Sequence, residues 1–165
     1  MQVKLLKDVC PLISSFHCGN KTLDEYFQNK ALDDDDATTY CFLEENLKTI
    51  IAVSSLSCNG IITKSANKMS TYPAVEIKMF AVNDSYKGKT IEGEEEHYSD
   101  WCFNSTIAKI MQFTDNYCGA SRVFLYSVPN AKHFYLRCGM HEFTDLMYPD
   151  DRPYFDCCIP MFMHL

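Results

Sequence analysis

The chain has little glycine, little proline and no long apolar run. Six glycines and six prolines among 165 residues are far fewer than a collagen-like or low-complexity chain carries. No stretch approaches the roughly 18 apolar residues of a membrane-spanning helix, and residues 1–8 lack the sustained apolar segment of a signal peptide. The sequence therefore predicts a cytoplasmic protein that makes no membrane contact.

Basic residues are also scarce: 15 lysines and arginines stand against 22 acidic residues, which gives a formal net charge of −7. A broad contact with nucleic acid or anionic lipid requires a basic surface, so this composition excludes all but a local basic patch. The hydrophobic content of 47% and the aromatic content of 13% exclude a disordered chain. We expect one domain over residues 1–165, long enough to bury a substantial core.

The nine cysteines lack the spacing of a disulfide framework, and their odd number favours reduced thiols. Cys157 and Cys158 are able to bind a metal together with His164, but the sequence has no second ligand pair at zinc spacing. We therefore expect no metal site. Cys138 lacks the companion His and Asn pattern of a catalytic nucleophile and is expected to be a small buried thiol.

Two helices of ordinary length are indicated by capping residues and apolar spacing. Thr22 and Glu25 form a capping box ahead of an apolar face that ends at the acidic run 33–36. Ser99 or Asp100 can begin a longer helix, which Gly119 would close. The expected buried face of this second helix comprises Phe103, Ile107, Ile110, Met111 and Thr114.

Strand patterns alternate with these helices, with no repeat and no linker. Residues 40–43 and 50–57 are expected to form a hairpin, residues 74–82 a longer strand after a turn at Pro73, and residues 156–163 the last strand. Helices between strands predict an α/β sandwich with at least one parallel pair, formed by the strands over 74–82 and 122–128.

A short helix is expected directly after the strand over residues 122–128, which Pro129 ends. Asn130 is a suitable N-cap, and Gly139 would supply the left-handed residue that stops the helix before strand resumes at Met140. Three residues would share its inward face: Ala131, Phe134 and Tyr135. This spacing carries a tyrosine inward at the end of a strand, which favours a functional site there.

The order of residues in this segment resembles the closing half of the GNAT family of N-acetyltransferases. The family's A-x-x-F-Y-x-x-x-G-F pattern is present, with Met140 in place of the final Phe. Residues 16–27 resemble the F-x-C-G-N-x-x-L-D-x-[WF]-[LF] start of a branch that includes toxins acetylating aminoacyl-tRNA. The resemblance covers nearly the whole chain. It implies an α/β GNAT fold: a mixed, mostly antiparallel central sheet with a splayed parallel strand pair, flanked by helices.

The resemblance also implies an acetyl-CoA site over residues 80–91. In the family, the backbone of the splayed strand hydrogen-bonds the pantetheine arm, and the amides of the following loop hold the pyrophosphate. Such a loop needs glycine for close backbone approach and free N–H donors for an anion. The cofactor-binding residues implied here are Phe80, Ala81, Val82, Lys87, Gly88, Lys89 and Thr90, together with Asn130.

The loop departs from the family pattern at Thr90, where a second Gly or Ala is usual. Four carboxylates then separate the loop from the long helix: Glu92, Glu94, Glu95 and Glu96. Carboxylates near a positive helix end stabilise that end themselves and oppose a pyrophosphate. A Walker loop at residues 88–90 is excluded because Asn83 stands where its first glycine is required. The remaining alternative is a surface turn followed by a solvated acidic loop.

Acyl transfer from a thioester to an amine requires a group that accepts the amine proton and a group that protonates the leaving thiolate. The resemblance implies Tyr135 as the acid. It implies Glu76 as the base, at the offset seen in histone-acetylating members; the tRNA-acetylating branch instead commonly has an arginine where Met79 stands. The alternatives are a Tyr135 packed beside Phe134 and a solvated Glu76 at a strand end.

The other titratable and aromatic residues give weaker signals. Histidine is a common proton acceptor in catalysis, but the spacing of His97, His133 and His141 indicates no partner. The aromatic residues Tyr148, Tyr154 and Phe155 are expected either to cover the acceptor site or to pack at the sheet edge.

The function that the resemblance implies is direct transfer of an acetyl group from acetyl-CoA to an amine, by an acyl-CoA-dependent N-acetyltransferase. The acceptor stays open between a small-molecule amine, a protein amino group and aminoacyl-tRNA. A homodimer and an antitoxin-like partner protein are also left open. The alternative is a degenerate GNAT domain that binds CoA or a protein partner without turnover, as Thr90 and the acidic insertion suggest.

Overall fold

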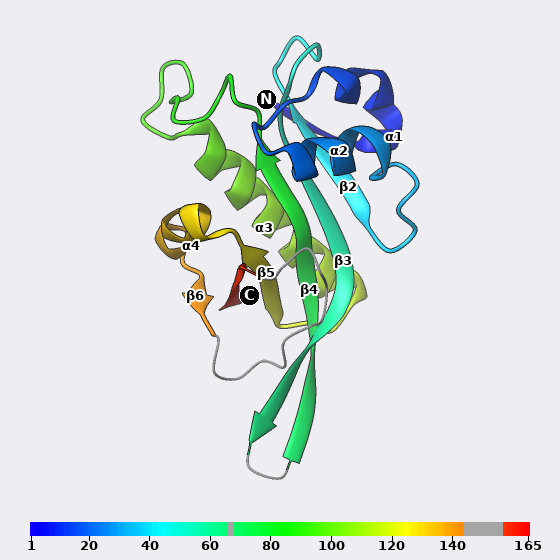
Figure 1. Ribbon diagram of the computed structural model, residues 1–165, viewed down its shortest axis with the longest axis vertical. Helices are drawn as coiled ribbons and strands as arrows, with labels where there is room; N and C mark the ends of the chain where they lie inside the picture. The colour runs from blue at the N-terminus through cyan, green and yellow to red at the C-terminus, as the bar shows by residue number, and fades with distance from the viewer. Residues whose placement is uncertain (66–67, 144–156) are drawn as a thin grey trace. The chain divides into compact units, whose positions relative to one another are not determined.

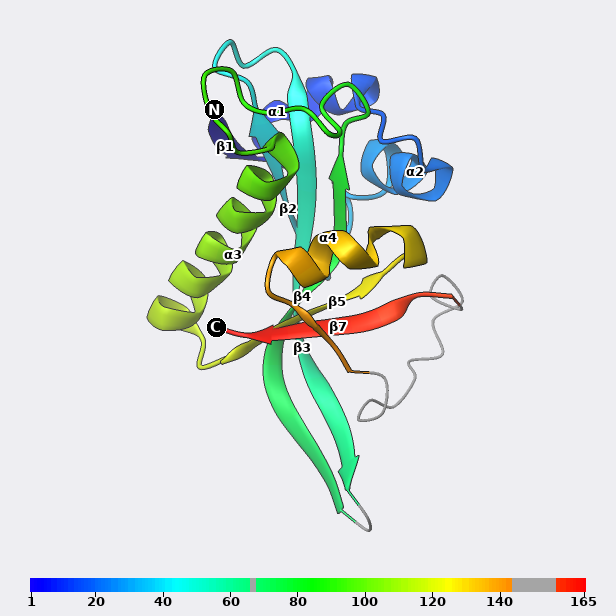
Figure 2. The ribbon, with the colours of Figure 1, turned by 90° about the vertical axis from the view of Figure 1, so that its left-hand side faces the viewer.

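The computed structural model describes residues 1–65, 68–143 and 157–165, and its ribbon is drawn in Figures 1 and 2. Its elements in chain order are β1 (Gln2–Leu5), α1 (Leu6–Val9), the 3₁₀ helix η1 (Cys10–Ser15), α2 (Lys21–Asn29), β2 (Thr38–Leu43), β3 (Ile50–Ser65), β4 (Lys68–Val82), α3 (Tyr98–Tyr117), β5 (Arg122–Ser127), the 3₁₀ helix η2 (Pro129–Ala131), α4 (Lys132–Arg137), β6 (His141–Glu142) and β7 (Ile159–His164).

Within these described residues, the strands form one seven-stranded sheet in the order β1-β2-β3-β4-β5-β7-β6. The pairs β1/β2, β2/β3, β5/β7 and β6/β7 are antiparallel, whereas β4 and β5 are parallel. The parallel register covers Val75↔Val123 and Glu76↔Phe124, although β4 continues to Val82 and β5 to Ser127. The mixed, mostly antiparallel sheet with one parallel pair is confirmed.

The chain divides into two compact units, which share β3, β4 and α3. Unit 1 comprises Met1–Ser57 and Lys78–Ile107, and unit 2 comprises Cys58–Ile77 and Ala108–Leu165.

In unit 1, helices cover both faces of the sheet. On one face, Phe16 and Phe27 pack with Val53 and Ala81; the two phenylalanine rings meet edge to face at 5.9 Å. On the other face, Cys102 from the start of α3 packs with residues of β2 and β3. Figure 2 shows α2 and the start of α3 on opposite sides of β2 and β3. Burial of each phenylalanine contributes about 1.5–3 kcal/mol.

In unit 2, the core lies on the paired part of β4 and β5. Ala74 of β4 and Phe124 of β5 pack with Ile61 and Phe143. β5 is paired with β7 along its whole length, from Arg122↔His164 to Ser127↔Ile159. This pairing fixes the strand that precedes α4.

The start of α2 differs from the expected capping box. Asn20 is the N-cap, and its Oδ1 accepts hydrogen bonds from the amides of Thr22 at 3.0 Å and Leu23 at 3.3 Å. The return hydrogen bond is made by Asp24, whose carboxylate accepts from the Cys18 amide at 2.7 Å. The side-chain oxygens of Asn20 and Asp24, four positions apart, therefore do what Thr22 and Glu25 were expected to do.

Pro73 lies inside β4 and not in a turn before it, so this prediction is wrong. Proline removes a backbone donor and is tolerated in a strand where one side needs no ladder hydrogen bond. The described pairing of β4 with β5 begins only at Val75, so at Pro73 that side of the strand has no partner in β5.

The hairpin of β2 and β3 is confirmed, and β3 extends beyond the expected end to Ser65.

Helix α3 begins at Tyr98, just before the expected cap. Its buried residues are Cys102, Phe103, Thr106, Ile110 and Thr114. Ile107 is only half-buried, and Met111 is 43% exposed, so neither belongs to this buried stripe. The small side chains of Cys102 and Thr106 complete it in their place.

Helix α4 is not capped by Asn130. Residues Pro129–Ala131 form a 3₁₀ turn, and the N-cap position is Ala131, which makes no side-chain capping bond. Pro129 favours this turn because its ring fixes φ near the helical value. Gly139 ends the segment with φ +86° as expected. Tyr135 is the buried residue of α4.

Three opening elements, β1, α1 and η1, were not predicted from the sequence. The last strand, expected over residues 156–163, is confirmed as β7, which runs from Ile159 to His164; residue 156 lies outside the described residues. Tyr148, Tyr154 and Phe155 also lie outside them. All nine cysteines are free thiols, and Cys138 is half-buried, not buried as expected. Among the described residues, none of the helices combines the length and apolar character needed to cross a membrane.

Candidate functional site

The loop after β4 is held in unit 1 by its first residue. The Asn83 amide donates to the Ile51 carbonyl at 2.8 Å, and its side-chain Nδ2 donates to the Ile50 carbonyl at 3.1 Å. Asn83 Oδ1 accepts from the Ser85 amide at 3.0 Å, which makes an Asx turn. Asn83 therefore ties the loop to β3, a role that excludes neither an anion site nor a simple turn.

The same loop packs against the opening motif over residues 16–27. The Asp84 amide donates to the His17 carbonyl at 2.9 Å. Lys87 Nζ donates to the Cys18 carbonyl and forms an ion pair with Asp84 Oδ1 at 2.6 Å. Because this pair is about half exposed, it adds little stability, but it balances the charge of Lys87.

Most backbone amides of the loop after β4 already donate a hydrogen bond within the protein. Those that donate to a backbone carbonyl or to the Asn83 side chain are Asn83, Asp84, Ser85, Tyr86 and Lys89. Within this described loop, the amides of Lys87 and Gly88 have no backbone acceptor. Gly88 has φ +69° with nothing within 4 Å of the position of a Cβ. These two amides can approach an anion.

The acidic insertion is a loop over residues 91–96 whose two ends are joined, so that α3 begins next to the loop after β4. We call this insertion the excursion. Thr90 bridges His97, the Ile91 amide donates to the Glu96 carbonyl at 2.9 Å, and the Tyr98 amide donates to the Lys89 carbonyl at 3.1 Å. Figure 1 shows this segment as the light-green loop before α3. Thr90 therefore closes the excursion, and the exposed Glu92, Glu94 and Glu95 do not separate Lys89 from α3 in space.

The end of β4 is buried. Ala81 is 5% and Val82 is 8% exposed, and the Phe80 ring meets Phe103 of α3 edge to face at 5.5 Å. These side chains belong to the core of unit 1. A cofactor contact at these positions would therefore use the backbone.

Glu76 lies in unit 2, inside β4 at the last pair of the parallel register. Its side chain is 1% exposed, so the interpretation as a solvated strand-end residue is wrong. The strand begins at Lys68, well before the expected start, which places Glu76 in its interior. Asn59 Nδ2 on β3 donates to Glu76 Oε2 at 2.7 Å, as a buried carboxylate requires.

Tyr135 is 7% exposed in unit 2, and its ring meets Phe134 edge to face at 5.0 Å. Burial raises the pKa of the Tyr135 hydroxyl well above its usual value, and the nearby thiols of Cys138 and Cys158 raise it further. The hydroxyl therefore stays protonated at neutral pH and acts as a hydrogen-bond donor. This environment agrees with both an acid and a packed tyrosine.

Solved structures share the fold of this chain. AtaT complexed with acetyl-methionyl-tRNAfMet has a TM-score of 0.73 at 11% identity, covering 99% of this chain and 94% of that one. A bacterial toxin has a TM-score of 0.72 at 15% identity, covering 93% of this chain and 83% of that one. AtaTR bound with acetyl-CoA has a TM-score of 0.70 at 12% identity, covering 99% and 92%.

The chain has the GNAT fold. Its sequence matches no protein-family model and no curated protein. At these identities the likeness shows the fold alone.

Within this GNAT fold, the expected residues fall into two groups. Unit 1 contains the strand end at Phe80 and the loop from Lys87 to Thr90, whereas unit 2 contains Glu76, Asn130 and Tyr135. Asn130 lies in the exposed 3₁₀ turn before α4.

Two polar groups were missed by sequence reasoning. Asn59 has no local signal, because its partner lies 17 positions away. The second is a network in which Asp34 Oδ2 accepts from Lys78 Nζ and from the Tyr26 hydroxyl, both at 2.7 Å. The run 33–36 signalled only a helix end. Among the described residues, no cluster of three metal-ligating side chains occurs.

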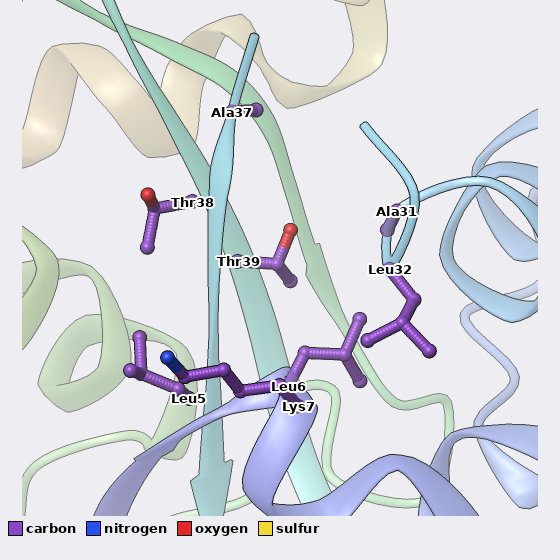
Figure 3. A pocket seen from close by; sticks show the side chains of 8 residues that line it. All are labelled: Leu5, Leu6, Lys7, Ala31, Leu32, Ala37, Thr38 and Thr39. Carbon is purple, nitrogen blue, oxygen red and sulfur yellow. The ribbon is translucent and has the colours of Figure 1, made fainter. Parts of the chain in front are cut away.

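A cavity of about 170 Å³ in unit 1 contains none of the expected site residues (Figure 3). Leu6 and Leu32 form an apolar side, and Thr39 contributes a hydroxyl that is bonded to Ser55 Oγ at 2.5 Å.

Proposed function

We propose that this chain is an acyl-CoA-dependent N-acetyltransferase that transfers an acetyl group from acetyl-CoA directly to an amine. The observation that carries the proposal is the position of Glu76: a buried carboxylate at the last parallel pair of β4 and β5, in a chain with the GNAT fold. Burying a carboxylate costs free energy unless it is hydrogen-bonded, so a carboxylate kept in the interior of a strand is a candidate for a functional role.

The residues present fit acetyl-CoA in a restricted way. The backbone of Phe80, Ala81 and Val82 would hydrogen-bond the pantetheine arm. The amides of Lys87 and Gly88, with the Lys89 side chain, would hold the pyrophosphate, since Lys89 makes no ion pair within the described part of the chain. Thr90 would act through the loop that it closes, and the role of Asn130 stays a prediction from the resemblance.

The chemistry assigned to the chain consists of two proton transfers. As the amine nitrogen bonds to the thioester carbon and the carbon–sulfur bond breaks, Glu76 takes the proton of the amine. Tyr135 gives its proton to the leaving sulfur. Each general acid or base of this kind contributes about 10²–10⁴ in rate.

The acceptor and partners are further parts of the proposal. AtaT has been solved with acetyl-methionyl-tRNAfMet and with the C-terminus of the antitoxin AtaR. These complexes favour aminoacyl-tRNA as one acceptor and an antitoxin-like protein as a partner. The net charge of −7 favours a small-molecule amine or a protein amino group instead.

A second candidate is a GNAT domain that binds CoA or a protein without turnover. It is favoured by the loop, in which five amides are already bonded and Lys87 is paired with Asp84. Such a loop offers an anion fewer donors than a glycine-rich one.

Calorimetry with acetyl-CoA, followed by thiol release with each acceptor class, tests the proposal. Polyamines, peptides with free amino termini and aminoacyl-tRNA form the acceptor panel. We expect saturable binding and release of one thiol per acetylated amine. Binding without thiol release would favour the second candidate. No binding at millimolar acetyl-CoA would exclude both acetyl transfer and CoA binding without turnover.

A further inference from the structure

Asn59 and Glu76 are joined across β3 and β4 within unit 2. Asn59 is exposed, whereas Glu76 is 1% exposed, and the Asn59 Nδ2 to Glu76 Oε2 distance is 2.7 Å. The exposed amide thus reaches inward to a carboxylate in the interior of the strand. Such a contact restrains a side chain that otherwise has three rotatable bonds.

The orientation of the Asn59 amide follows from its other hydrogen bond. Its Oδ1 accepts from the Gly60 amide at 2.8 Å. A flipped amide would set Oδ1 against the Glu76 oxygen and Nδ2 against the Gly60 donor, so both hydrogen bonds would be lost. The NH₂ group therefore faces Glu76.

Gly60 keeps the two strands close at this point. A Cβ at Gly60 would lie 2.9 Å from Thr71 Cγ2 and 3.4 Å from the Tyr72 carbonyl oxygen. A residue larger than glycine at position 60 would displace the Thr71 side chain. The residue next to Asn59 thus packs closely against the strand that carries Glu76.

We propose that Asn59 is a positioning residue for Glu76: its amide holds the carboxylate in the orientation in which it accepts the proton of the acceptor amine. This inference rests on the proposed acetyl transfer. Asn59 itself carries no proton in the reaction and acts only through Glu76. A general base must lie within hydrogen-bond reach of the proton that it removes, so a carboxylate free to rotate is a poorer base.

A rate cycle with Asn59→Ala and Glu76→Gln tests this role, using thiol release with the acceptor found above. We expect Asn59→Ala to lower kcat by about tenfold, a part of the general-base contribution, with the KM for acetyl-CoA unchanged. In the Glu76→Gln background, Asn59→Ala should lower kcat no further, because the two residues act as one unit. Asn59→Gln, which keeps the amide, should recover part of the rate.

Asn46 supplies a matched control in the turn after β2. Its Nδ2 donates to Glu44 Oε2 at 2.9 Å, and its Oδ1 accepts from the Lys48 amide at 2.8 Å. The two asparagines thus have the same pair of partners, a glutamate and a nearby backbone amide. Asn46→Ala should leave kcat unchanged. Thermal unfolding of every variant separates loss of fold from loss of rate.

Three outcomes would overturn the inference. If Asn59→Ala keeps the wild-type kcat while Glu76→Gln lowers it, Asn59 does not position Glu76, but the proposed function still stands. An equal loss in both backgrounds shows that Asn59 acts independently of Glu76. If the wild-type protein transfers no acetyl group to any acceptor, the proposed function fails and the inference fails with it.

Discussion

The carboxylate of Asp84 occupies the space that a side chain on Gly19 would need. A Cβ on Gly19 would lie 2.6 Å from Asp84 Oδ2 and 3.0 Å from Oδ1, and Gly19 has φ +73°. Gly19 belongs to the opening motif and Asp84 to the loop after β4. The contact gives the motif's glycine a physical reason: its backbone lies against the loop that we propose to hold the pyrophosphate.

Replacing Gly19 with alanine should therefore cost both stability and cofactor affinity. The left-handed backbone alone costs a non-glycine residue about 1–2 kcal/mol, and the contact with Asp84 adds to this cost. Displacement of the loop should weaken acetyl-CoA binding severalfold. Urea unfolding and calorimetry measure the two effects.

Gly93→Ala is the control for this prediction. Gly93 has φ +81° but nothing within 4 Å of a Cβ, so the variant contains the backbone strain without the contact. We expect a smaller loss of stability than in Gly19→Ala. Equal losses would show that Asp84 does not restrict position 19.

Asp34→Asn should make the stability of the protein less dependent on acidic pH. Burial alone would raise the pKa of Asp34, but the hydrogen bonds from Lys78 and Tyr26 hold this pKa below its ordinary value of 3.8. A carboxyl whose pKa is lower in the folded state contributes stability above its unfolded pKa and loses it as pH falls through the folded value. The difference in the free energy of unfolding between wild type and Asp34→Asn should thus be constant above about pH 5 and shrink below pH 3.8.

The size of the effect follows from the unpaired ammonium group left behind. Lys78 is 21% exposed, so loss of its partner should cost about 1–3 kcal/mol at neutral pH. The matched control is Glu25→Gln, which breaks the Glu25–Lys30 pair, more than half exposed on both sides. That variant should lose less than about 1 kcal/mol. Similar losses in both variants would contradict the role assigned to the Asp34 network.

The predictable parts of the fold were those encoded by local patterns. The β2–β3 hairpin and the stop at Gly139 each follow from residues close together in the sequence, and the parallel pair follows from the helix that separates its two strands. Pro73 was misread because its tolerance in β4 depends on where β5 begins to pair. That information lies in another part of the sequence.

The same limit applies to the candidate site. The resemblance placed Glu76 in a strand and Tyr135 in a helix. It left open that Glu76 is a solvated residue at a strand end, and the burial of Glu76 excludes this. The contacts Asn59–Glu76 and Gly19–Asp84 join segments that are distant in the sequence. Only the pairing of strands and the packing of the loop bring them together.

Removing the carboxylates of the excursion should tighten acetyl-CoA binding modestly. Glu94 and Glu95 are exposed, so their repulsion of a pyrophosphate acts through solvent. Changing both to glutamine should strengthen binding by up to about fivefold at low salt and by little at high salt. Calorimetry at two ionic strengths measures this.

The control for this prediction changes the net charge by the same amount elsewhere in unit 1. Asp35 and Asp36 are exposed after α2, and changing both to asparagine should leave the affinity nearly unaltered. Equal tightening in both double variants would indicate an effect of net charge and not of the excursion.

Tyr135→Phe should lower turnover by about 10- to 1000-fold, bracketing a general-acid contribution, with acetyl-CoA affinity little changed. The ring remains to pack against Phe134, and only the hydroxyl that would protonate the leaving sulfur is lost. Because burial raises the pKa of Tyr135, wild-type turnover should show no loss from its ionisation up to about pH 10. Tyr26→Phe is the matched control: it removes the hydroxyl that donates to Asp34 and should lower stability without lowering turnover. Thiol release and thermal unfolding distinguish the two variants, and unchanged turnover in Tyr135→Phe would assign Tyr135 to packing alone.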